Sequence, residues 1–304
     1  MDDIRLTAEL RRDGFSADDI ARGCRDGRLS RVRRGAYASS NPVDGRPEDL
    51  HLRLVMATLP QLRRDAVLSH DSAAVVHGLP VWSRGLDRVH ITRPRIGGGV
   101  ERGVVVVHSS DLPDDDVVEL HGLRVTSMAR TVADLGRTRP IDQSVAAGDR
   151  AMTLGLDRHT LDAVIAAQRG WPGVPRARQV AKLIDGRAES PGESVSRVRC
   201  WEAGLPKPTL QYVVRCDGVQ IGRCDFAWEE LGTLGEFDGR VKYGRLLRAD
   251  ESIQDVVYRE KQREDALRDL GWQVVRWTWG ELYEPGTVAN RLRRAFRRGR
   301  LVAL

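Results

Sequence analysis

The chain has 304 residues, of which 41% are hydrophobic and 30% charged, which is typical of a soluble globular protein with two or three domains. Its 49 Lys and Arg exceed its 43 Asp and Glu, and the resulting formal charge of +6 favours a polyanionic partner without proving one. No apolar run approaches the ~20 residues needed to span a bilayer, so we expect no membrane partner.

The N-terminus and the cysteines indicate the compartment. The chain opens with Met1, Asp2 and Asp3, and no apolar core of a signal peptide follows. Four cysteines without a Cys-x-x-Cys pair are typical of reduced, buried thiols. We therefore expect a cytoplasmic protein.

The first 40 residues have the pattern of a small DNA-binding unit. Residues 6–12 predict a helix that Gly14 stops, and Ser16 is a good N-cap for a second helix. The alternation over residues 29–37 then predicts a basic strand and a turn. Helix, glycine turn, helix and basic strand is the outline of a winged helix-turn-helix over residues 1–40.

The arginines of this unit predict contact with DNA, mainly through phosphates. A small helical cap with a solvated arginine face is the competing interpretation. Residues 27–37, Gly-Arg-Leu-Ser-Arg-Val-Arg-Arg-Gly-Ala-Tyr, resemble the N-terminal domain of AbiEi-like antitoxins, in which this wing follows the recognition helix. The candidate DNA-binding residues are Arg22, Arg25, Arg31, Arg33 and Arg34.

A polar linker containing Pro and Gly leads into a mixed α/β stretch. The expected helices and strands alternate along it, and a final helix is expected over 141–168 before a Pro/Gly break at 171–175. Residues 68–74 and 130–135 resemble the middle region of AbiEi antitoxins. This resemblance implies an α/β middle domain over residues 41–170. The other expected elements are helices 50–59 and 127–135, a strand that enters a helix over 66–74, and strands 88–92, 103–108 and 123–126.

Polar residues in the middle domain suggest catalysis at first sight. Residues 69–72, Ser-His-Asp-Ser, resemble part of a hydrolase relay, but adjacent side chains point in different directions. Helix capping by Ser69 or Asp71 is the simpler interpretation. His90 and His108 could bind a metal across paired strands, yet without an acid or Cys cluster we expect ordinary half-buried histidines.

Two acidic strands stand out in the last third of the chain. Residues 223–228 and 234–239 each alternate in polarity, and an acidic turn containing Gly separates them. A hairpin would set Asp225 roughly opposite Glu236, and Asp238 shares the face of Glu236. Carboxylates this close repel one another unless a cation lies among them, so the pattern predicts a divalent-metal site.

From residue 189 to the C-terminus the chain resembles the PD-(D/E)XK nuclease superfamily, in its Vsr-like branch related to very-short-patch repair. The family pattern is a helical Glu, a strand Asp, a second strand with an acid before Asp-Gly, a helix, and a strand of the type Val-Val-Arg-Trp. The resemblance implies a restriction-endonuclease-like α/β/α domain over residues 176–304. The matching segments, in order, are Glu193, Asp225, 236–239, 259–263 and 271–277.

The resemblance also implies a mechanism with Mg²⁺ or Mn²⁺ as cofactor. Metal ligation by Glu193, Asp225 and Glu236 would lower the pKa of a bound water and stabilise charge on the phosphate. Asp238 replaces the lysine of the family's Glu-x-Lys motif. The candidates for the missing cation are Lys242 and Lys261, and the candidates for holding the scissile phosphate are Lys261 and Arg263.

Each of these residues has a competing structural role. Residues 190–193, Ser-Pro-Gly-Glu, also form a capping box at the start of a helix. Arg223 or Arg276 could form a salt bridge with Asp225 in place of a metal, and Asp238 with its following glycine could simply open a turn.

Two further segments have both a structural and a functional interpretation. They are a helix expected over residues 252–270 and the basic tail. Glu260, Arg263 and Glu264 interrupt the helix's apolar stripe, so they should meet either a site or one another. The basic tail, residues 291–300, is by default a solvated helix face, although phosphate contact beside a nuclease site is the alternative.

Two functions follow from this multidomain α/β organisation. The first is a metal-dependent DNA endonuclease in phage defence or repair, and the retention of Asp225 and Glu236 favours it. The alternative is a non-catalytic AbiEi-type antitoxin or transcriptional regulator with a degenerate nuclease fold, for which Asp238 leaves room. The expected partners are DNA and, for either function, a cognate toxin or defence protein.

Overall fold

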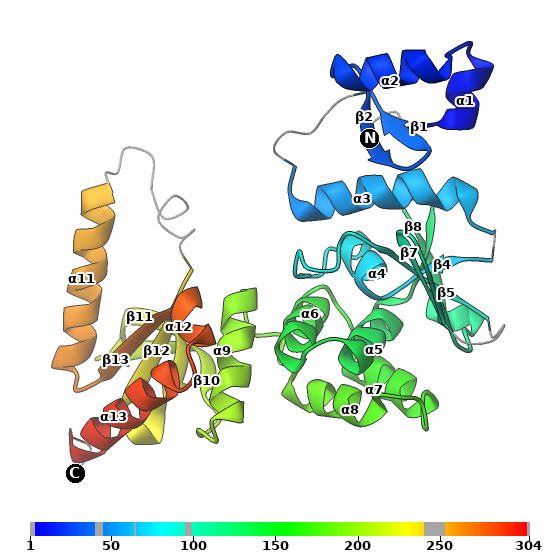
Figure 1. Ribbon diagram of the computed structural model, residues 1–304. Helices are drawn as coiled ribbons and strands as arrows, with labels where there is room; N and C mark the ends of the chain where they lie inside the picture. The colour runs from blue at the N-terminus through cyan, green and yellow to red at the C-terminus, as the bar shows by residue number, and fades with distance from the viewer. Residues whose placement is uncertain (1–3, 40–44, 64, 95–98, 240–252, 303–304) are drawn as a thin grey trace. The chain divides into compact units, whose positions relative to one another are not determined.

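The computed structural model describes residues 4–39, 45–63, 65–94, 99–239 and 253–302. The chain divides into two compact units. Unit 1 comprises Met1–Arg139 and Leu156–Arg178, and unit 2 comprises Pro140–Gly155 and Gln179–Leu304. Both units are mixed α/β (Figure 1), so the expectation of a multidomain α/β protein is confirmed at this coarse level.

Unit 1 begins with two short helices and a three-stranded antiparallel sheet of order β1-β3-β2. Gly14, at φ +90°, makes the turn between the helices, and Gly35, at φ +84°, makes the turn between β2 and β3. The Ser16 hydroxyl accepts a hydrogen bond from the backbone N–H of Asp19 at 3.1 Å, which confirms the predicted N-cap. The elements are β1 (Ile4–Leu6), α1 (Thr7–Arg12), α2 (Ala17–Arg25), β2 (Ser30–Arg33) and β3 (Ala36–Ala38).

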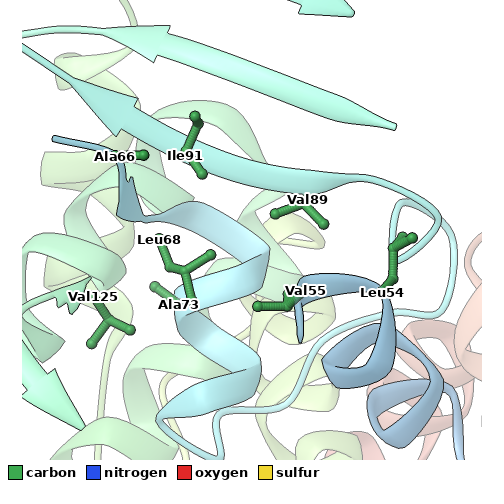
Figure 2. Packing of buried hydrophobic residues seen from close by; sticks show 8 residues of the cluster. All are labelled: Leu54, Val55, Ala66, Leu68, Ala73, Val89, Ile91 and Val125. Carbon is green, nitrogen blue, oxygen red and sulfur yellow. The ribbon is translucent and has the colours of Figure 1, made fainter. Parts of the chain in front are cut away.

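The rest of unit 1 contains a six-stranded sheet of order β6-β7-β5-β4-β9-β8 and several helices. Its strands are β4 (Val67–Leu68), β5 (Val89–Arg93), β6 (Val100–Arg102), β7 (Val105–Ser109), β8 (Val117–Leu120) and β9 (Leu123–Thr126). The helices are α3 (Pro47–Thr58), α4 (His70–Val76), α5 (Met128–Thr138) and α7 (Arg158–Ala167), and α8 (Val174–Leu183) spans the boundary between the units. Figure 2 shows the core between this sheet and its helices, where Val55, Leu68 and Val89 are fully buried.

The single helix expected over residues 141–168 is wrong. The structure has α6 (Ile141–Thr153), which belongs to unit 2, and α7, which belongs to unit 1. Gly155 lies between them at φ +97°, a backbone conformation that ends a right-handed helix. The Asp157 carboxylate then caps α7 by accepting a hydrogen bond from the N–H of Thr160 at 2.9 Å. The glycine and the capping acid were both visible in the sequence.

Unit 2 contains a four-stranded sheet of order β10-β11-β12-β13, in which β12 and β13 are parallel and the other pairs antiparallel. The chain order is α9 (Pro191–Glu202), β10 (Thr209–Cys216), β11 (Val219–Trp228), β12 (Thr233–Asp238), α11 (Ile253–Asp269), β13 (Gln273–Thr278), α12 (Trp279–Tyr283) and α13 (Thr287–Val302). Helix α11 covers one face of the sheet, where Leu267 packs on Leu234, and α9 lies on the other (Figure 1).

Close contacts hold α9 against the sheet of unit 2. The indole N–H of Trp277 on β13 donates to the Ser196 hydroxyl at 2.7 Å. A Cβ at Gly192 would lie 2.0 Å from the Phe237 ring, so this position of the helix has room for glycine alone. A buried ion pair between Arg197 and Asp149, at 2.6 Å, ties α9 to α6. The site residues at the start of α9 are therefore firmly positioned.

The four cysteines are free thiols, as predicted, but only Cys200 and Cys224 are buried, and Cys24 and Cys216 are partly exposed. Burial raises the pKa of Cys200 and of Cys224 to about 12, and the nearby Glu236 adds to the effect at Cys224. Among the described residues, no helix is long and apolar enough to cross a membrane.

Candidate functional site

The hairpin predicted for the acidic strands is present. Strands β11 and β12 pair antiparallel, and their last paired residues are Phe226 and Gly235. Continuing this register sets Asp225 opposite Glu236, as the sequence predicts. At this point the Asp225 carboxylate accepts a hydrogen bond from the backbone N–H of Phe237 at 2.8 Å. The side chain of Asp225 thus engages a backbone donor of the neighbouring strand.

Both carboxylate oxygens of Glu236 are held by arginines. Its Oε1 lies 2.7 Å from the Nη2 of Arg263 on α11, and its Oε2 lies 2.9 Å from the Nη2 of Arg276 on β13. The Glu236 side chain is 12% exposed. The guanidinium groups therefore supply, at Glu236, the positive charge that a metal ion would otherwise supply.

The two arginines belong to a larger network of charges. Glu260 pairs with both Arg263 and Arg276, and the Glu264 carboxylate lies 3.2 Å from the Nε of Arg276. Burial alone would lower the pKa of Arg263 and Arg276, but the carboxylates outweigh it and raise both. Of the polar residues that interrupt the apolar stripe of α11, Glu260 and Arg263 pair with each other, Arg263 also reaches Glu236, and Glu264 reaches Arg276. Arg276 pairs with Glu236, whereas the alternative drawn from the sequence was a pair with Asp225.

Glu193 lies at the start of α9 and is fully engaged in capping. The Ser190 hydroxyl accepts from the N–H of Glu193 at 3.2 Å, which confirms Ser190 as the N-cap, and it donates to the Glu193 carboxylate at 2.7 Å. The Glu193 carboxylate thus returns to the side chain of Ser190 in place of the backbone N–H that a full capping box uses. The other carboxylate oxygen accepts from the N–H of Glu189 at 2.9 Å and from the side-chain amide of Gln211 at 2.8 Å. Gln211 has φ +53° within β10, and no feature of the sequence pointed to it.

The remaining nuclease candidates within the described residues, and Arg223, lie on different elements of unit 2. Lys261 is exposed on α11, and no ion pair or hydrogen bond of its side chain is seen in the described part of the chain. Asp238 ends β12 in register with Thr278 of β13. Lys242 lies outside the described residues. Arg223 pairs with Glu189 at 2.8 Å.

The carboxylates do not fit a resident divalent cation as they are arranged. Such an ion needs several oxygens directed at one point. Glu193 and Glu236 instead have separate sets of protein donors, and Asp225 accepts a backbone N–H. Across the described residues, no group of three or more His, Cys, Asp or Glu is arranged to hold a metal ion.

The arginines of α2 and of the β2–β3 hairpin are in different environments. Arg22 lies 3.7 Å from the Asp19 carboxylate. Arg33 is half-buried, and its guanidinium donates to the carbonyls of Ala57 at 3.0 Å and Arg34 at 3.1 Å. Burial lowers the pKa of Arg33. A guanidinium fixed in this way positions the β2–β3 hairpin and is less available to an external phosphate.

Arg25, Arg31 and Arg34 are exposed, and none has an acidic partner among the described residues. Arg25 lies in the last turn of α2, Arg31 lies on β2, and Arg34 lies in the turn between β2 and β3. Three of the five candidate DNA-binding arginines are therefore exposed and unpaired.

Comparisons with known proteins identify similar chains without an assigned activity. No family model matches the sequence. The uncharacterized proteins Rv2248 of Mycobacterium tuberculosis (strain ATCC 25618 / H37Rv) and MT2308 of Mycobacterium tuberculosis (strain CDC 1551 / Oshkosh) are each 28% identical over 284 residues, which cover 91% of this chain and 96% of theirs. The crystal structure of the RV2827C protein from Mycobacterium tuberculosis aligns with a TM-score of 0.39 and 15% identity, over 71% of this chain and 84% of that chain.

Proposed function

We propose that the protein is a non-catalytic DNA-binding regulator of the AbiEi antitoxin type, in which a nuclease-like fold in unit 2 serves as a binding module. The observation that carries the proposal is the pairing of Glu236 with Arg263 and Arg276. A metal-dependent nuclease needs this carboxylate for its cation, and here two guanidinium groups occupy it. The proposed partners are duplex DNA and a cognate toxin.

The DNA-binding surface is Arg25, Arg31 and Arg34. These side chains come from the end of α2 and from the β2–β3 hairpin, which are the parts of a winged helix that face DNA. Their guanidinium groups are free to exchange water and counterions for phosphate oxygens. Binding should therefore be strongly dependent on salt.

The test is the salt dependence of DNA affinity for a triple variant, Arg25→Gln, Arg31→Gln and Arg34→Gln. Each lost phosphate contact should reduce the slope of log affinity against log salt by about one unit. The matched control replaces three exposed arginines outside this surface, Arg150 on α6, Arg169 after the end of α7 and Arg178 on α8, and so removes the same charge. An equal loss of slope in both triple variants would show that net charge alone accounts for the effect. It would reject this surface.

A metal-dependent DNA endonuclease is the second candidate, and one observation favours it. Asp225 and Glu236 lie on adjacent strands where their pairing ends, within the helix and strand order that the nuclease resemblance implies. Wild type and Glu236→Gln should be incubated with Mg²⁺ or Mn²⁺ and with single-stranded, duplex and mismatched DNA. We expect no cleavage by either protein. Cleavage by wild type that Glu236→Gln abolishes would reject the non-catalytic proposal.

A further inference from the structure

Helix α13 of unit 2 carries charge of a single sign. Six of its 16 residues are arginine, and none is acidic. Helix α11 of the same unit differs, because its sequence mixes acids with bases and its Arg268 pairs with Glu264 one turn away. Alternating signs are typical of a helix face that meets only water. The single sign of α13 therefore needs a different explanation.

The apolar face of α13 packs on the sheet of unit 2 (Figure 1). Leu292 is fully buried, and the ring centroid of Phe296 lies 5.2 Å from that of Trp228 on β11. A Cβ at Gly299 would overlap the carbonyl oxygen of Leu231, so the helix backbone touches the chain just before β12. This apolar face is already covered by protein, whereas a helix that lies on a membrane buries it in lipid.

Four arginines lie on the face of α13 that points away from the sheet. All four are exposed, and the buried positions of the helix are on the opposite side. Residues four apart in a helix lie one above the other, about 6 Å apart along the axis, so these side chains form two rows of two. This arginine array consists of Arg293, Arg294, Arg297 and Arg298.

The guanidinium groups of the arginine array have either no partner or a neutral one. Arg294 and Arg297 make no hydrogen bond or ion pair within the part of the chain that the structure describes. Arg293 donates to the carbonyl oxygen of Ala203 at 2.6 Å. The Nε of Arg298 donates to the side-chain oxygen of Gln273 at 2.9 Å. The positive charge of the array is therefore uncompensated.

Acids on neighbouring elements do not neutralise the arginine array. Glu281 on α12 pairs with Arg291, which lies outside the array, and Glu202 at the end of α9 pairs with an arginine of its own helix. Glu229 and Glu230 are exposed in the turn between β11 and β12, which packs on α13. Within the described residues, neither forms an ion pair with the array.

The helix dipole does not account for the arginine array. The negative end of the dipole favours cations only within the last turn, residues 299–302, and the array ends before it. Like charges four positions apart repel each other and destabilise a helix. The array contains two such pairs, Arg293 with Arg297 and Arg294 with Arg298. A polyanion that lies across the face would remove this repulsion.

The composition of the exposed face selects the kind of polyanion. Protein interfaces bury a core of apolar and aromatic side chains, and single-stranded nucleic acids stack on aromatic ones. Over residues 287–298, the only exposed side chain besides the array is Asn290. Contacts with the phosphates of a duplex need no more than basic and polar groups.

We propose that the arginine array of α13 binds the phosphate backbone of duplex DNA, which gives unit 2 a DNA contact of its own. The contact is independent of base sequence, because the guanidinium groups meet phosphates and not base edges. The choice of DNA among duplexes rests on the proposed function, in which the β2–β3 hairpin of unit 1 binds duplex DNA. The two surfaces belong to different units, so each can be removed alone.

Salt-dependent titration of the full chain with a DNA duplex of arbitrary sequence tests the array. Arg294→Gln with Arg297→Gln removes the two unpartnered guanidinium groups and should reduce the slope of log affinity against log salt by about two units. Arg294→Lys with Arg297→Lys keeps the charge and should keep the slope. The matched control, Arg150→Gln with Arg215→Gln, removes the same charge at exposed positions on α6 and β10 and should leave the slope at the wild-type value.

Comparison with the hairpin variants separates this inference from the proposed function. A lower slope in the α13 double variant, with an unchanged slope in the triple variant of Arg25, Arg31 and Arg34, would support the array and reject the unit 1 surface. A lower slope in the triple variant alone would reject the array and leave the unit 1 surface in place. Absence of duplex binding by wild type would reject both.

Modification of arginines by phenylglyoxal, followed by peptide mass spectrometry, locates the contact directly. Duplex DNA should slow the modification of Arg294 and Arg297 severalfold, while Arg150 and Arg215 react as in the free protein. Equal modification of Arg294 and Arg297 with and without duplex DNA would overturn the proposal. Stronger protection by single-stranded DNA, duplex RNA or phosphatidylserine vesicles than by duplex DNA would overturn it as well.

Discussion

The arginines of the β2–β3 hairpin in unit 1 and those around Glu236 in unit 2 have opposite surroundings. Arg31 and Arg34 are exposed without an acidic partner among the described residues. Arg263 and Arg276 are half-buried and share the carboxylates of Glu236 and Glu260. The difference teaches that a basic residue is available to an external phosphate only where the fold leaves its charge uncompensated.

The two units should also differ in their response to acid, and this is the largest effect we expect. In unit 1, His90 and His108 have folded pKa values of about 3 and 4 against an ordinary value of 6.5, mainly because they are buried. The unfolded chain therefore binds more protons below pH 6.5. The free energy of unfolding should fall by about 1.4 kcal/mol per pH unit for each such histidine as the pH drops towards 4.

In unit 2 a drop in pH also lowers the free energy of unfolding, but it does so at a lower pH than in unit 1. Burial raises the pKa of Glu260, but Arg263 and Arg276 outweigh it and leave the value below its ordinary 4.5. The stabilisation from this carboxylate is present above pH 4.5 and is lost below it. Hydrogen exchange followed by peptide mass spectrometry at pH 7 and pH 5 should show early loss of protection in β5 and β7, with β12 and β13 unchanged. Equal loss in both units would contradict the comparison.

Removing one arginine from the C-terminal network should be the next largest effect. Arg263→Ala leaves Glu236 and Glu260 half-buried with Arg276 as their remaining shared partner, and we expect a loss of about 2–3 kcal/mol in the free energy of unfolding. Urea denaturation measures it. The control is Arg158→Ala, which breaks the exposed pair with Asp162 on α7 and should cost about 0.5 kcal/mol or less. Similar costs would mean that the network is effectively solvated.

The smallest effect separates two arginines of the same strand. Arg33→Gln removes hydrogen bonds to the carbonyls of Ala57 and Arg34 and should cost about 1 kcal/mol of stability, with an unchanged salt slope of DNA binding. Arg31→Gln should leave stability unchanged and reduce that slope by about one unit. Thermal unfolding together with salt-dependent DNA titration tests both variants. A reduced salt slope in Arg33→Gln would show that Arg33 also contacts DNA.

The parts of the site that are local in sequence could be predicted. Alternating polarity and an acidic Gly-containing turn predicted the β11–β12 hairpin and the position of Asp225 opposite Glu236. The Ser190 N-cap and its contact with Glu193 were predicted in the same way, because the two residues are three apart. Both depend on chain periodicity, which the sequence displays directly.

The partners that are remote in sequence could not be predicted. Arg263 lies 27 residues after Glu236 and reaches it because α11 packs across the sheet. His90 and His108 lie close together because β5 pairs in parallel with β7, and no local pattern specifies that pairing. The sequence predicted ordinary half-buried residues at His90 and His108, because it shows no acid or Cys ligands nearby. It did not predict that the ring of His70, which lies on α4, stacks on the ring of His108.

The division of the chain has a consequence for the order of folding. The boundaries between the two units fall after Arg139, Gly155 and Arg178, so neither unit is a continuous segment. During synthesis, unit 1 must wait for residues 156–178, including buried Leu161 and Ile165 of α7, before its core is complete. Helix α6 is made earlier still, yet the partner of its Asp149, Arg197, emerges some 48 residues later. A nascent chain of this protein therefore carries unfinished apolar surface well past its midpoint.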